Sequence, residues 1–256
     1  MEKPVTVLLG LGQTVGEAIA RRMLDDGQEV LAVDPSQSLL DELRKTAGPK
    51  VAHLHGAVHT RLGLRNALSA AMETFRRVDH VIAIPDLPDG DKVLDLDIGS
   101  FEANLTRAVR GAVETIRIFT SAMVEHREDP GSTLERSRQV GSFTFVLSLG
   151  VHLSQPGTFT ESVTQHAIFG AVKAASVELA ELGIRVNAVI ALRPRTEQQE
   201  NWLKSRTPSG RPAMAEEIAE TALFLSRPEV AIMTGQAVVL DGGRQRLSGL
   251  AIHQDD

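Results

Sequence analysis

The chain has 256 residues, a formal net charge of −6, 42% hydrophobic residues, and neither Cys nor Tyr. This length and hydrophobic content suit one large α/β domain, and the acidic balance disfavours nucleic acid as a partner. The lack of Cys excludes disulfides and thiolate metal sites, and it is typical of a cytoplasmic protein. The apolar run 5–12 is too short to span a membrane, and no residue pattern predicts a metal site.

Short apolar runs alternate with amphipathic stretches along the whole chain. The runs that predict strands are VTVLLG (5–10), EVLAVD (29–34), KVAHLHG (50–56), DHVIAIP (79–85), FTFVLSLG (143–150), IRVNAVIAL (184–192) and QAVVLDGG (236–243). The stretches that predict helices are 15–26, 61–76, 101–124, 160–182 and 215–226. Nearly continuous apolar strands are typical of a parallel sheet that is covered on both faces.

This order predicts an α/β fold, a Rossmann-type doubly wound parallel sheet of about seven strands with helices on both faces. We expect one domain over 1–256, with a C-terminal tail at 244–256. The most polar segment, 125–141, predicts a solvated loop with a short helical piece.

A glycine-rich turn follows the first predicted strand. Gly10, Gly12 and Gly16 lie between this strand and the first helix, where backbone N–H groups can face a pyrophosphate. Asp34 ends the second strand, where a carboxylate can bind the ribose hydroxyls of NAD. Two alternatives stay open: glycine also permits tight helix–strand packing, and Asp34 can cap the helix that begins near Ser36.

Two long motifs in the C-terminal third resemble the classical short-chain dehydrogenase/reductase family. VELAELGIRVNAV (177–189) is similar to the family's ALELAPxGIRVNAV. The segment 210–243, which begins GRPAMAEEIA and ends TGQAVVLDGG, is similar to its GRxxxPEEIA…ITGQxxxVDGG. The resemblance implies a Rossmann-type NAD(P)-binding domain, usually tetrameric, that moves a hydride between nicotinamide and a carbonyl or alcohol carbon.

In that family a Ser, a Tyr, a Lys and an Asn carry the proton chemistry. The resemblance places the Ser at Ser148, although a Ser at a strand end is also an ordinary turn former. Asn187 lies 39 residues after Ser148, as the family's spacing requires without a gap. In this register the Tyr position falls on Glu161 and the Lys position on Gln165. Neither residue type reproduces the family's phenol or cation.

A second register uses HAIFGAVKAA (166–175), which has the spacing of the family's Y-x-x-x-K motif. It places Phe169 at the Tyr position and Lys173 at the Lys position, but it requires an insertion and a deletion in one long helix. We therefore favour the ungapped register. The family's Asn position falls on Ala108, while Asn104 lies one helical turn earlier on the same face.

Several positions that hold the cofactor in the family also differ here. Thr14 stands for the middle Gly of the turn, Ala57 for the Asp that meets adenine, and Pro85 interrupts the segment after the fourth strand. Thr196 is retained where the family often contacts the nicotinamide amide. We therefore expect NAD binding to be weakened or absent.

These departures lead to the hypothesis of a protein that has lost dehydrogenase/reductase activity. It would be a non-catalytic subunit in a homo- or hetero-oligomeric dimer or tetramer, paired with an active paralogue. One alternative is a divergent NAD-binding oxidoreductase or non-redox enzyme that uses Ser148 and Glu161. The other is an NAD sensor without turnover. The substrate stays open, because specificity in the family lies in the variable loop near 193–212, which here contains Trp202.

Overall fold

The computed structural model describes residues 3–12, 14–88, 91–125, 140–191 and 197–247. The strands are β1 (Val5–Leu9), β2 (Glu29–Asp34), β3 (Val51–His55), β4 (His80–Ala83), β5 (Gly141–Ser148), β6 (Ile184–Ala191) and β7 (Ala237–Leu240). The helices are α1 (Thr14–Asp25), α2 (Gln37–Ala47), α3 (Arg61–Phe75), α4 (Ile98–Glu125), α5 (Phe159–Ala180), α6 (Glu197–Lys204) and α7 (Ala215–Ser226).

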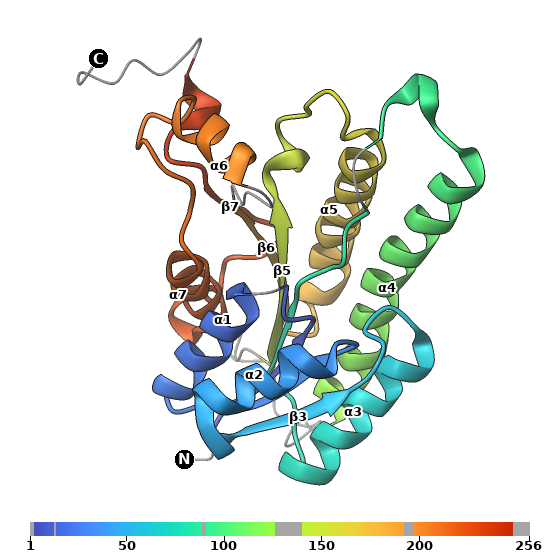
Figure 1. Cartoon of the computed structure of the whole chain (residues 1–256). Helices are drawn as coiled ribbons and strands as arrows, with labels where there is room; N and C mark the ends of the chain where they lie inside the picture. The colour runs from blue at the N-terminus through green and yellow to red at the C-terminus, as the bar shows by residue number, and fades with distance from the viewer. Residues whose placement is uncertain (1–2, 13, 89–90, 126–139, 192–196, 248–256) are drawn as a thin grey trace.

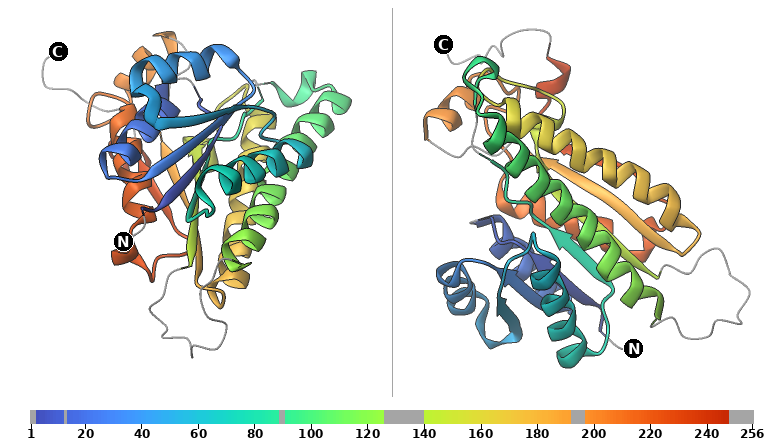
Figure 2. Two further views of the ribbon diagram at one scale, coloured as in Figure 1. Left: turned by 90° about the horizontal axis from the view of Figure 1, so that it is seen from below. Right: turned by 90° about the vertical axis from the view of Figure 1, so that its right-hand side faces the viewer.

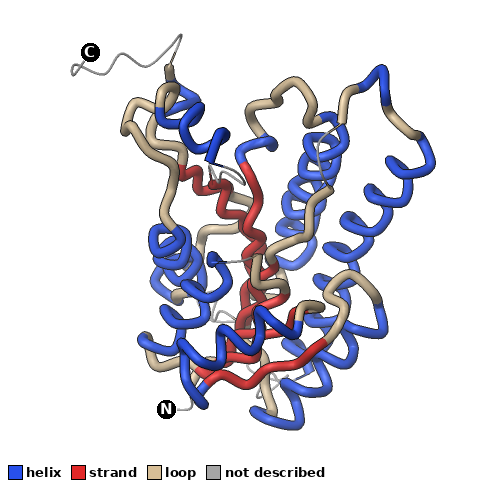
Figure 3. The backbone as a smooth tube through the Cα atoms, in the orientation of Figure 1, coloured by secondary structure: helices blue, strands red, loops and turns tan. Residues whose placement is uncertain are grey.

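The seven strands form one parallel sheet in the order β3-β2-β1-β4-β5-β6-β7. Figures 1 and 3 show this sheet between two groups of helices. The chain order reverses at β1 and β4, and in open α/β sheets ligands bind at the carboxyl ends of the strands beside such a reversal. The predicted fold class is therefore confirmed.

Alternate residues of each strand enter two separate hydrophobic cores. In β1, Val7 and Leu9 pack in the core that α3, α4 and α5 cover, whereas Leu8 packs in the core that α1, α2 and α7 cover. The views in Figure 2 show the two helical layers. Because both faces of the sheet are buried, both sets of side chains must be apolar, which explains the nearly continuous apolar runs.

Some helix boundaries differ from those predicted. The helix α4 begins at Ile98, a few residues before the predicted start, because the Asp97 carboxylate accepts the Ser100 N–H at 2.7 Å and supplies an early cap. The helix α6 lies within the loop that was predicted near 193–212. Residues 126–139, most of the predicted polar loop, lie outside the described residues.

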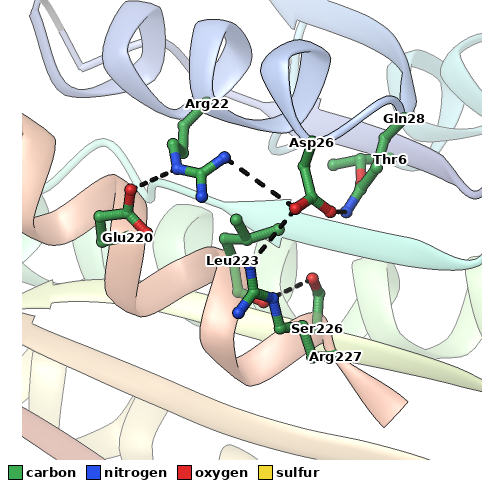
Figure 4. A network of polar contacts seen from close by, with 8 residues as sticks. All are labelled: Thr6, Arg22, Asp26, Gln28, Glu220, Leu223, Ser226 and Arg227. Carbon is green, nitrogen blue, oxygen red and sulfur yellow. Dashed lines mark hydrogen bonds and ion pairs between the residues drawn. The ribbon is translucent and has the colours of Figure 1, made fainter. Parts of the chain in front are cut away.

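The helices α1 and α7 pack side by side on one face of the sheet, and charged residues join their exposed edges. Arg22 binds Glu220, and Arg227 contacts Asp26 at 3.3 Å (Figure 4). Exposed ion pairs of this kind stabilise a protein by about 1 kcal/mol or less. The buried face of the two helices therefore supplies most of this contact. In the part of the chain that is described, no helix has the length and apolarity that crossing a bilayer requires.

A buried histidine lies at the amino end of the sheet. His80 is 8% exposed, and its Nδ1 lies 3.0 Å from Ser142 Oγ. Burial lowers its pKa to about 4; Asp79 opposes this shift, while the cations Arg185 and Arg77 add to it. The folded protein therefore holds His80 neutral at pH values where the unfolded chain binds a proton.

This histidine predicts a loss of stability in acid. As the pH falls from about 6.5 to about 4, the free energy of unfolding should decrease by about 3 kcal/mol, because the unfolded state alone gains a proton. Urea unfolding at several pH values measures this slope. His80→Asn should reduce the slope, whereas His53→Asn, at an exposed position, should keep it. An unchanged slope in His80→Asn would contradict the assignment.

Candidate functional site

Three polar side chains meet at the carboxyl end of β5. The Ser148 hydroxyl donates to Glu161 Oε1 at 3.0 Å, and both residues are half-buried. The Gln165 amide nitrogen lies 2.6 Å from Ser148 Oγ and 2.9 Å from Glu161 Oε1. The Gln165 amide oxygen accepts the Ser148 backbone N–H at 2.7 Å. The ungapped register had assigned these two residues of α5, Glu161 and Gln165, to the family's Tyr and Lys positions.

The start of α5 is held by a residue distant in sequence. The Asp91 carboxylate accepts the Thr160 backbone N–H at 2.9 Å and also binds the Thr160 hydroxyl. The Asp91 carbonyl accepts the Phe159 N–H at 3.2 Å. These contacts fix the first turn of α5 and hence the direction of Glu161. Sequence reasoning missed Asp91, because no local pattern joins it to a helix 69 residues away.

Gly150 leaves space for the Gln165 side chain beside Ser148 and Glu161. A Cβ on Gly150 would lie 2.8 Å from Gln165 Nε2 and 3.4 Å from Ser148 Oγ. The Gly150 N–H also donates to Ser148 Oγ at 3.3 Å. The fully buried Gln165 can therefore reach both Ser148 and Glu161 only beside a residue without a side chain. The sequence signal was the Gly two positions after the strand-end Ser.

Phe169 and Lys173 interact with each other and not with Ser148. The Lys173 ammonium lies 4.8 Å from the centre of the Phe169 ring, a cation–π contact. His152 packs edge-on against the same ring, with centroids 6.3 Å apart. Burial, His166 and Lys173 lower the pKa of His152. Phe169 and Lys173, further along α5, form a separate basic and aromatic cluster with His152, which lies shortly after β5.

The glycines of the first turn have different structural roles. Gly10 and Gly12 adopt left-handed φ values of 83° and 50°, which favour glycine. Gly16 instead allows close packing, because a Cβ there would lie 2.4 Å from the backbone oxygen of Leu11. The Gly16 N–H also donates to that oxygen at 2.7 Å. The turn therefore brings the N-terminus of α1 against the carboxyl end of β1.

Asp34 holds the same turn from the neighbouring strand. One carboxylate oxygen accepts the Leu11 N–H at 2.7 Å, and the other accepts the Ser36 N–H at 2.7 Å. The side chain is buried, with 4% exposed. Ser36 then caps α2 by accepting the Leu39 N–H. Each carboxylate oxygen keeps a second lone pair, so the predicted ribose contact requires that an edge of Asp34 become accessible.

Two further predicted residues, Ala108 and Asn104, lie on α4. Ala108 is buried in α4 and, with Pro85, lines a narrow cavity beside the ends of β1 and β4. Asn104 is half-buried one turn earlier. Thr196 lies outside the described residues, as does the side chain of Trp202. Among the residues that the structure describes, no group of three or more His, Asp or Glu could hold a metal ion.

A seven-stranded doubly wound sheet with polar side chains at the end of β5 defines a Rossmann-type protein of the short-chain dehydrogenase/reductase class. The family model described as enoyl-(acyl carrier protein) reductase matches residues 10–245. The chain belongs to this family, which confirms the resemblance found in the sequence.

Relatives match along almost the whole chain. It is 25% identical to short-chain dehydrogenase reductase 4 of Arabidopsis thaliana, with 95% of this chain and 83% of the relative covered. It is also 25% identical to the 3-oxoacyl-[acyl-carrier-protein] reductase FabG of Thermotoga maritima, with 95% and 98% covered. In fold it is similar to a 3-ketoacyl-(acyl-carrier-protein) reductase from Brucella melitensis complexed with NADH. The TM-score is 0.84, the identity is 23%, and 95% and 99% of the two chains are covered.

These comparisons correct one expectation from the sequence. The hypothesis of a non-catalytic subunit that has lost dehydrogenase/reductase activity is wrong, because the matching family and these relatives are named for reductase activity. The hypothesis treated each departure from the family's motifs as a loss. It did not consider that Ser148, Glu161 and Gln165 form a connected polar cluster.

Proposed function

We propose that the protein is a nicotinamide-dependent oxidoreductase that uses Ser148 and Glu161 for proton transfer. The observation that carries this proposal is the contact among Ser148, Glu161 and Gln165 at the carboxyl end of β5. The reductase names of the family and its relatives support the redox class of the reaction. The NADH complex of the Brucella relative supports the choice of cofactor.

The residues of the first turn fit a dinucleotide. Gly10 and Gly12 allow the left-handed backbone that the turn requires, and the positive end of the α1 dipole, at Thr14, suits a pyrophosphate. Asp34, at the end of β2, would meet the adenosine ribose through an edge of its carboxylate that cofactor binding must uncover, because the side chain is buried and accepts the Leu11 and Ser36 N–H groups. When bound, the nicotinamide supplies or accepts the hydride at the substrate carbon.

Ser148 is the group best placed to meet the substrate oxygen. The Ser148 hydroxyl can turn from Glu161 to donate to a carbonyl oxygen of the substrate. Meanwhile the Gln165 amide N–H keeps the Ser148 oxygen in place. The protonated Glu161 then supplies the proton that the substrate oxygen takes up during reduction, and Glu161 is left as a carboxylate. In the oxidative direction the carboxylate removes this proton.

The direct test is turnover by the purified full chain. NADH and NADPH oxidation is followed at saturating cofactor with short ketones, 3-oxoacyl thioesters and 2-enoyl thioesters. The family and the acyl-carrier-protein reductase relatives motivate the two thioester classes. Oxidation that depends on one substrate class supports the proposal. Absence of turnover with every pair, in a protein that binds the dinucleotide by calorimetry, would overturn it.

Association of this chain with other subunits stays a prediction. Residues 248–256 of the predicted C-terminal tail lie outside the described residues. We propose a homo-oligomer, to be measured by light scattering of the purified protein.

A further inference from the structure

A groove of about 580 Å³ lies between the beginning of α3 and the first half of α4. These two helices run side by side on one face of the sheet (Figure 2). Residues 59–61 form one wall, and residues 99–110 of α4 form the other. The volume lies within the range of sites for small molecules and cofactors. None of the groups in the Ser148 cluster lines this groove.

The walls of the groove are basic although the chain is acidic. Arg61, Arg107 and Arg110 line it together with His59, and Glu102 is the acidic residue among the lining groups. The formal net charge of the whole chain is −6. Three guanidinium groups around one cavity concentrate positive potential there and attract an anion.

Two of these arginines are available to a ligand. Arg107 binds the exposed carboxylate of Asp86 at 2.6 Å. Within the described ranges, no ion pair joins Arg61 or Arg110 to a carboxylate, and both side chains are exposed. A guanidinium presents a planar set of N–H donors that matches two phosphate oxygens at once. Arg61 and Arg110 therefore suit a phosphate group better than a side chain with a single point charge would.

The start of α3 adds further attraction for an anion. Thr60 caps this helix by accepting the Gly63 N–H at 3.1 Å, and Thr60 and Arg61 both line the groove. The positive end of a 15-residue helix thus lies at the same wall as Arg61. The helix end and the arginines together favour the same negative charge.

From these observations we propose that the groove binds a phosphate-bearing small molecule of nucleotide size, separately from the Ser148 cluster. Arg61 and Arg110 bind the phosphate groups from opposite walls, and His59 lies where it can contact the rest of the ligand. His59 and Arg107 also line the narrow cavity beside the ends of β1 and β4. A ligand in the groove would therefore lie next to the proposed dinucleotide cleft.

Calorimetry of the full chain with ADP and with inorganic pyrophosphate, at constant ionic strength, tests this site. The double variant Arg61→Ala/Arg110→Ala should weaken the binding of both probes by about tenfold or more, because each lost guanidinium removes charge-assisted hydrogen bonds. The matched control is Arg65→Ala, an exposed arginine one turn further along α3 that does not line the groove. It should change the affinity by less than about twofold.

Three outcomes would overturn the proposal. The first is that neither probe binds. The second is an equal loss in Arg65→Ala, which would indicate only nonspecific attraction to the surface. The third is complete displacement of ADP by NADH together with unchanged affinity in Arg61→Ala/Arg110→Ala, which would place ADP in the dinucleotide cleft. ADP binding that depends on Arg61 and Arg110 and persists at saturating NADH supports a separate site.

Discussion

Glu161→Gln is expected to lower kcat for reduction by about 100-fold or more, because it removes the transferable proton from the cluster. The amide has the same shape and keeps an oxygen that can accept hydrogen bonds from Ser148 and Gln165. The fold and KM should therefore change little. Ser148→Ala should also lower kcat, because the substrate oxygen loses its hydrogen-bond donor. Initial rates and thermal unfolding of each variant measure the two effects separately.

Two further variants on α5 are matched controls. Glu178→Gln makes the same chemical change at an exposed position of this helix and should leave kcat within about twofold of the parent. Phe169→Tyr introduces a phenol, but position 169 lies about 12 Å from Glu161 along the helix axis. It contacts Lys173 and His152 there, so no gain in rate is expected. Full activity in Glu161→Gln, or a large gain in Phe169→Tyr, would refute the assigned acid–base group.

Gly16→Ala is expected to reduce the free energy of unfolding by about 3 kcal/mol. The added Cβ would lie 2.4 Å from both the Cα and the carbonyl oxygen of Leu11, far inside contact distance. These are backbone atoms, so no side chain can rotate away, and the glycine turn or α1 must shift. Because Asp34 also binds the Leu11 N–H, the shift should also disturb the glycine turn that is proposed to bind the dinucleotide.

Gly170→Ala is the matched control for this substitution. Gly170 is exposed within α5, and a Cβ there would meet no atom within 4 Å. Alanine favours the helical backbone over glycine, so this variant should be more stable by about 0.5–1 kcal/mol. Chemical unfolding measures both variants. Equal effects at the two positions would show that the packing of Gly16 against Leu11 does not matter.

The sequence predicted the seven strands and most of the helices because those patterns are local. Strands β1, β2, β4, β5 and β6 are buried on both faces, so they appear as nearly continuous apolar runs, whereas the edge strand β3 is partly exposed. The start of α4 was missed because Asp97 caps the helix through one side-chain contact. The short helix α6 was missed because its polar sequence resembles that of a loop.

For the candidate site, the sequence assigned Glu161 and Gln165 to positions that the structure brings into contact with Ser148, and their functional roles stay predictions. Counting from Ser148 to Asn187 selected Glu161 and Gln165, and these side chains contact Ser148. Their chemistry was judged against the family's Tyr and Lys, which led to the wrong expectation of a non-catalytic subunit. Asp34 was proposed for either the ribose or a cap, and its carboxylate accepts backbone N–H groups of both Leu11 and Ser36.

The sequence by itself determined the doubly wound sheet, the family and the positions that face the carboxyl edge, because strand burial and helix periodicity leave local patterns. Only the tertiary structure decided how those positions interact. The hydrogen bonds between Ser148 and α5 depend on the space beside Gly150. They also depend on the hydrogen bond from the Thr160 N–H to Asp91, which fixes the first turn of that helix. The basic groove likewise depends on the packing of α3 against α4. Such contacts join residues that are distant in the chain, and no periodic pattern in the sequence predicts them.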